Sequence, residues 1–85
     1  MMKKIAKFIK MKDVADELFE INQKAHQPNP DWTELENKAF KALKSIGIVG
    51  NDSRDWIKSV IHSPKWSKTS LKDVIENLEL ETKEK

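Results

Sequence analysis

The chain contains no cysteine, two histidines and a single arginine among its 85 residues. Without cysteine there is no disulfide framework, no thiolate nucleophile and no cysteine-rich zinc site. No uninterrupted apolar run of about eighteen residues occurs, so the sequence offers no candidate membrane span. We therefore expect a cytoplasmic protein with no integral membrane association, whose fold depends on side-chain packing.

The residue types that most often perform catalysis are scarce, and they are poorly placed for it. His26 and His62 fall at the predicted ends of helices, and neither has the spacing of a metal site. The carboxylate pair Asp16 and Glu20 is expected on a solvated helix face. No combination of nucleophile, base and orienting group can be assembled from these residues. We expect no catalytic residues, no cofactor and no metal, and so no enzyme.

Apolar residues recur at spacings of three and four, which is typical of amphipathic helices. This pattern predicts an all-α fold: a compact bundle of about four short helices in a single domain covering residues 1–85. A frayed tail is expected at 79–85. The first helix is either continuous or broken near residues 11–13. The expected helices are Lys3–Ala25, Trp32–Ser45, Ser53–His62 and one from Ser70 to about Leu78.

Helix start and stop signals support these boundaries. Asp31, with Glu34 three residues later, predicts the N-cap of the second helix. Gly47 is placed to end that helix in the left-handed conformation. Asp52 or Ser53 is expected to cap the third helix.

Residues 1–12 form a basic amphipathic segment with five lysines and no acid. Lys3, Lys4, Lys7 and Lys10 recur at helical spacing and would form a cationic ridge. Such a ridge can bind phosphates without sequence preference, or an anionic membrane surface. It can equally be the exposed face of a core helix.

Three tryptophans are a high number for this length, and Trp32 and Trp66 lie in or beside predicted loops. Tryptophan is enriched at binding hot spots because it combines a large apolar area with a hydrogen-bond donor. The leading hypothesis is a small non-enzymatic protein-interaction module, acting as a regulator or inhibitor. It would bind another protein, or a second copy as a homodimer, through an apolar patch. The candidate residues are Trp32, Trp66, Ile48 and Val49.

The alternative hypothesis is a nucleic-acid-binding protein that uses the basic segment together with the loop around Trp66. It requires the segment and the loop to converge on one face of the molecule. A single arginine argues against sequence-specific base readout. The candidate residues are Lys3, Lys4, Lys7, Lys10, Lys65, Trp66 and Lys68.

Overall fold

A computed structural model describes the backbone of residues 2–83 and the side chains of residues 11–82. The described chain forms four α-helices joined by short connections. The predicted all-α bundle of four helices is therefore confirmed. The helices are α1 (Met2–Ala25), α2 (Trp32–Lys44), α3 (Gly50–His62) and α4 (Ser70–Lys83).

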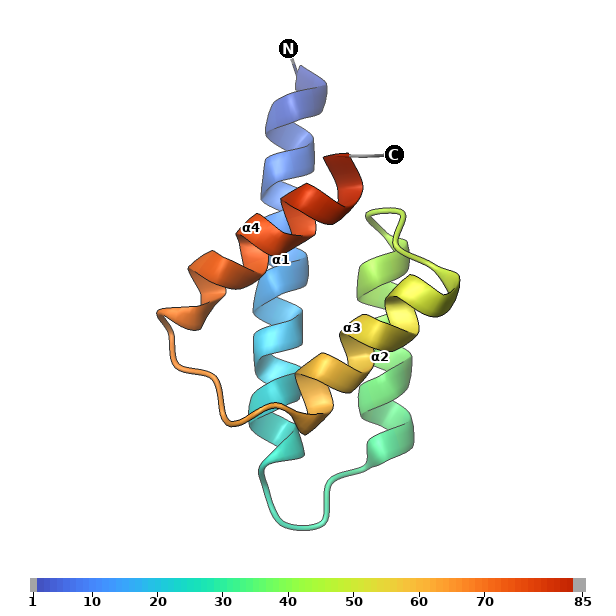
Figure 1. Ribbon diagram of the computed structural model, residues 1–85, viewed down its shortest axis with the longest axis vertical. Coiled ribbons are helices and arrows are strands. Elements are labelled where there is room, and N and C mark those ends of the chain that lie inside the picture. Colours follow the sequence, from blue (N-terminus) through green and yellow to red (C-terminus); the bar gives the residue numbers. More distant parts are fainter. Residues whose placement is uncertain (1, 84–85) are drawn as a thin grey trace.

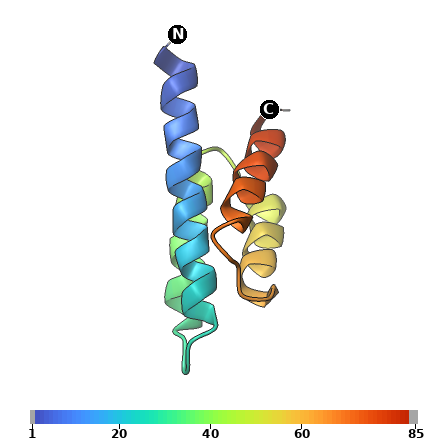
Figure 2. The same cartoon turned by 90° about the vertical axis from the view of Figure 1, so that its left-hand side faces the viewer.

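The longest helix, α1, organises the other three. It is continuous, because it contains neither glycine nor proline to interrupt it. Its 24 residues span about 36 Å at about 1.5 Å per residue. It packs against α2, α3 and α4, whereas the backbone of α4 packs on α1 alone. Figure 1 shows the first turns of α1 extending beyond the other helices, and Figure 2 shows two layers, α1 with α2 and α3 with α4.

Every helix contributes fully buried side chains to one core. Leu18, Leu43, Val60 and Leu78 come from the four helices in turn, and each is completely inaccessible to solvent. Burial of an aliphatic side chain of this size contributes about 1.5–3 kcal/mol to folding. Trp56 and Trp66 pack against the edge of this core and stay half-buried.

The end of α2 follows the predicted glycine signal. Gly47 has φ +87, and the Ile48 N–H donates to the Leu43 carbonyl at 3.0 Å. The Gly47 N–H donates to the Lys44 carbonyl, also at 3.0 Å. These two bonds form a Schellman motif, in which the residue after the glycine makes an apolar contact with the preceding helix. Ile48 is fully buried as a result.

The start of α3 differs from the sequence prediction. Helix α3 begins at Gly50 with Val49 as its N-cap, and no side chain caps it. The prediction that Asp52 or Ser53 caps α3 is therefore wrong. The chain enters the helix directly after the buried Ile48, and the Ser53 hydroxyl instead donates to the Gly50 carbonyl inside the first turn, at 2.8 Å.

Two further predictions concern helix ends. The N-cap prediction for α2 is confirmed, because Asp31 Oδ1 accepts from the Glu34 N–H at 3.2 Å. The tail expected to fray at 79–85 continues as helix to Lys83. Thr82 is buried there, and its hydroxyl donates to the Leu78 carbonyl at 2.9 Å.

The amide of Asn22, on α1, is buried where three parts of the chain meet. Its Nδ2 donates to the Val60 carbonyl on α3 at 2.8 Å and to Ser63 Oγ at 3.2 Å. Its Oδ1 accepts from the Trp66 N–H at 2.8 Å. Asn22 itself is fully inaccessible to solvent. One side chain therefore ties α1 to the end of α3 and to the connection at 63–69.

Replacing Asn22 with leucine tests this role at nearly constant volume. The Val60 carbonyl and the Trp66 N–H would lose their buried partner, so we expect Asn22→Leu to lower the free energy of unfolding by about 2–4 kcal/mol. Urea denaturation followed by circular dichroism measures this loss. Gln27→Leu, at an exposed position, is the control, and equal stability of the two variants would contradict the assignment.

Candidate protein-binding groove

Two large aromatic side chains are exposed on α2. Trp32 has 46% of its surface exposed and Phe40 has 38%. Eight residues separate them, which places them about 12 Å apart on the same side of the helix. Glu36 lies between them at the same helical spacing, and we call Trp32, Glu36 and Phe40 the aromatic row. It runs beside the buried stripe of α2, which consists of Leu35, Ala39 and Leu43.

Helix α3 supplies the floor and the opposite wall of a groove. Ile57 and Ile61 are buried, with 6% and 8% of their surfaces exposed. Arg54, Lys58 and His62 are exposed at spacings of four residues, so they form one row along the helix. We call these three residues the basic row.

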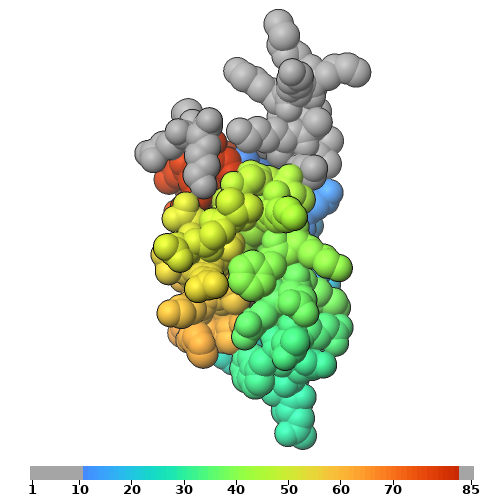
Figure 3. Space-filling model, turned by 90° about the vertical axis from the view of Figure 1, so that its right-hand side faces the viewer, coloured from blue at the N-terminus to red at the C-terminus, as the bar shows by residue number. Residues whose placement is uncertain are grey.

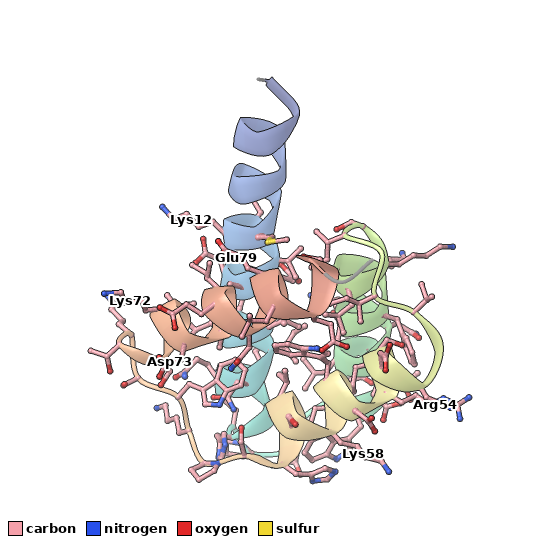
Figure 4. All side chains as sticks on the ribbon, turned by 45° about the horizontal axis from the view of Figure 1, so that its top comes forward. Lys12, Arg54, Lys58, Lys72, Asp73 and Glu79 are labelled. Atoms are coloured by element: carbon pink, nitrogen blue, oxygen red, sulfur yellow. The ribbon has the colours of Figure 1, made fainter. Side chains whose placement is uncertain are left out.

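The aromatic row, the two isoleucines and the basic row line a single groove of about 580 Å³. Figure 3 shows the face of the molecule on which α2 and α3 lie side by side. Figure 4 shows Arg54 and Lys58 projecting from the same side of α3 into solvent. The groove thus has an apolar floor formed by the two isoleucines. The aromatic row forms one wall, the aromatic wall, and the basic row forms the other, the basic wall.

The charges on α3 are divided between two faces. Asp52 and Asp55 face away from the groove and line a second cleft, between α3 and α4, of about 870 Å³. Glu81 of α4 adds a third carboxylate to that cleft, and Trp56 also lines it. Helix α3 therefore presents basic residues toward α2 and acidic residues toward α4.

Trp66, which the sequence placed in a binding patch, has a structural role. Besides the bond from its N–H to Asn22, its carbonyl accepts from Gln23 Nε2 at 2.8 Å. Its side chain is half-buried and packs against the core. Trp66 is not among the residues that line the groove with Trp32. The two tryptophans do not form one patch.

Ile48 and Val49 also lie apart from Trp32. Ile48 is fully buried by the Schellman motif, which excludes it as a surface contact and corrects its place among the candidates. Val49 is 53% exposed, but it follows the last turn of α2 whereas Trp32 begins the helix. In the sequence, the apolar residue that directly follows Gly47 is the signal for the burial of Ile48.

The basic segment and the Trp66 loop lie at different ends of α1. Trp66 is bonded to Asn22, and twelve helical residues separate Lys10 from Asn22, a distance of about 18 Å. Lys65 and Lys68 are exposed in the loop. The side chains of Lys3, Lys4, Lys7 and Lys10 lie outside the described residues. The backbone of α1 therefore separates the basic segment from the Trp66 loop along the helix, and this separation does not support the convergence on one face that the nucleic-acid hypothesis requires.

The hydrogen bond that Lys38 donates to Glu34 and the charge of that carboxylate raise the pKa of Lys38. The two groups form a 3.2 Å ion pair on the exposed surface of α2, outside the groove. Among the described residues no group of three histidine or carboxylate side chains could hold a metal ion, and no described helix is long and apolar enough to cross a membrane.

Several groove residues were not predicted as a site. Phe40, Arg54, Lys58 and Ile57 are not among the site residues that the sequence predicts. The sequence does contain one indication of this site: the residues of the aromatic row and those of the basic row both recur every four positions. What the sequence could not show was that these two rows face each other, because that depends on how α2 packs against α3.

Exposure of the aromatic row predicts how its substitution affects stability. We expect Trp32→Ala and Phe40→Ala each to lower the free energy of unfolding by about 1–2 kcal/mol, because 46% and 38% of their surfaces are already in contact with water. Ile57→Ala in the floor should cost about 2–4 kcal/mol. Chemical denaturation of the three variants measures this, and a large loss for either aromatic variant would show that the residue belongs to the core.

Comparison with known proteins finds no match for this chain. No family model matches the sequence, no curated protein matches it, and no solved structure matches the fold. The groove between α2 and α3 is therefore interpreted from its own residues. Those residues combine an apolar floor and two aromatic side chains with charged side chains on both walls, and surfaces that bind other proteins use the same kinds of residue.

Proposed function

We propose that this chain is a small, non-enzymatic protein-interaction module that binds another protein through the groove between α2 and α3. By occupying part of that partner's surface it would act as a regulator or inhibitor. The proposal includes a cytoplasmic location, which a cysteine-free composition favours.

One observation carries the proposal: Trp32 and Phe40 are exposed beside the nearly buried Ile57 and Ile61. A folded chain of this size has few large apolar side chains to spare, so two partly exposed aromatics on one groove are unusual. Tryptophan and arginine are the residue types most enriched at interface hot spots. The groove contains both Trp32 and Arg54.

The groove also has the form that proteins use to bind an amphipathic helix. In that mode an apolar helix face lies in a groove between two helices, and its anchors contact the floor at helical spacing. Here α2 and α3 provide the walls, and Ile57 and Ile61, four residues apart, provide the floor.

Nucleic-acid binding by the basic segment and the Trp66 loop is the second candidate, and it receives less support. Trp66 uses its backbone to join α1 at Asn22, which lies about 18 Å along the helix from Lys10, the nearest of the four candidate lysines of the segment. The backbone that carries the candidate lysines and the backbone of Trp66 therefore lie at separate levels along α1.

Site-specific photocrosslinking tests the proposal in the cells that naturally produce the protein. Phe40 is replaced with p-benzoylphenylalanine, and the exposed Lys72 on α4 is replaced with the same residue as the control. We expect ultraviolet light to join one partner protein to position 40 and not to position 72. Adding Trp32→Ala to the position-40 variant should weaken that adduct, because it removes part of the same wall.

An adduct with twice the mass of the chain would identify a second copy as the partner. Identical adducts from both positions, or no adduct from position 40, would contradict binding through the groove.

A further inference from the structure

We infer that the segment bound in the α2–α3 groove is an acidic, amphipathic helix of about three turns. This inference rests on the proposed function and adds the chemistry of the partner. It follows from the length of the groove, the nature of its floor and the charges on its two walls.

The two rows set the length of the bound segment. Trp32 and Phe40 are eight residues apart on α2, and Arg54 and His62 are eight residues apart on α3. Each row therefore extends about 12 Å, to which the side chains add. A bound helix of about three turns covers that length.

The floor and the aromatic wall require apolar anchors on one face of the partner. Ile57 and Ile61 retain 6% and 8% exposure, so they present only narrow surfaces at the bottom of the groove. Trp32 and Phe40 contribute most of the apolar area that a partner would cover. Anchors on the partner at spacings of three and four residues would contact this floor and wall together.

The basic wall selects acidic residues along one flank of that helix. Arg54 and Lys58 are exposed, and neither takes part in the ion pairs found among the described side chains, Lys24–Glu20 and Lys38–Glu34. Their charged groups are thus available to a partner. Carboxylates along the flank would pair with them and leave the apolar stems of both residues to cover the edge of the interface.

The acidic residues on the opposite face of α3 further favour an acidic partner in the groove. Asp52 and Asp55 line the opposite cleft with Glu81, so a basic segment would be attracted there and not to the groove. An acidic segment is attracted to the groove and repelled from that cleft. The division of charge on one helix therefore distinguishes the two kinds of partner.

A nucleic acid is also an anion, but the groove suits it less well. Glu36 lies between Trp32 and Phe40, in the middle of the wall on which bases would stack. A phosphate backbone passing along the groove would approach this carboxylate. A peptide can avoid Glu36 by placing a polar or basic residue opposite it, whereas a phosphate backbone carries a negative charge at every nucleotide.

Selection from random peptides tests the partner's chemistry without knowing its identity. The folded full-length chain is immobilised, and peptides of about sixteen residues, long enough for about four helical turns, are selected from a phage-displayed library. Clones that also bind the Trp32→Ala/Phe40→Ala double variant are removed. We expect the enriched sequences to carry net negative charge and to repeat apolar residues every three or four positions.

Charge reversal on the groove then tests the basic wall. For an enriched peptide, fluorescence anisotropy should show that Lys58→Glu weakens binding about tenfold, and that Arg54→Glu does so similarly. Lys72→Glu makes the same change in net charge at an exposed position on α4 and should leave the affinity unchanged. Binding should weaken as the salt concentration rises. Circular dichroism confirms that each variant keeps its helical content.

The outcomes separate this inference from the proposed function. Enriched peptides that need Trp32 and Phe40 but are neutral or basic, or that bind Lys58→Glu and Lys72→Glu equally, would overturn the acidic partner and leave the groove as a protein-binding site. A selection in which no clone depends on Trp32 and Phe40 would overturn both. Tighter binding of a single-stranded oligonucleotide than of any selected peptide, lost in Lys58→Glu, would replace the peptide with a nucleic acid.

Discussion

The buried amide of Asn22 is the interaction on which the arrangement of these helices most depends. Its Nδ2 satisfies the Val60 carbonyl and its Oδ1 satisfies the Trp66 N–H, each at 2.8 Å. Both partners lie where α3 ends and the chain turns toward α4. A backbone group buried without a partner destabilises the fold, so these bonds favour one placement of the turn over others. The same amide therefore ties α1 to α3, the helix that carries the groove residues Ile57 and Ile61.

Most of the fold was predictable because helix formation here is governed by local signals. The three-and-four spacing of apolar residues, Asp31 with Glu34, and Gly47 each act within a few residues of chain, and the structure agrees with each of them. The start of α3 was mispredicted for the opposite reason. Ile48 is drawn into the core by a contact with Leu43, and this tertiary constraint brings the chain into α3 before the polar residues that usually cap a helix.

The candidate site was much less predictable, because it depends on which helix faces meet. Trp66 looked like an exposed loop residue, but its backbone bonds with Asn22 and Gln23 join residues more than forty positions apart, and no local pattern indicates such a pair. Arg54 and Lys58 were not among the residues that the sequence predicts for a site. Their place in a groove follows from the packing of α2, which brings Trp32 and Phe40 opposite them. Asp52 and Asp55 lie on a different face of the same helix. In this chain, periodicity identified the elements, and packing determined which of their residues share a surface.

The short connection between α2 and α3 has a consequence for how the groove forms. Both walls come from consecutive helices within residues 32–62, and the Schellman motif at Gly47 closes the link between them. The contacts within this helical hairpin are therefore close in sequence, and contacts of low sequence separation form quickly because little loop entropy is lost. The backbone of α4, which comes last along the chain, touches α1 and contributes no wall to the groove. During synthesis the residues of both walls leave the ribosome before α4 does.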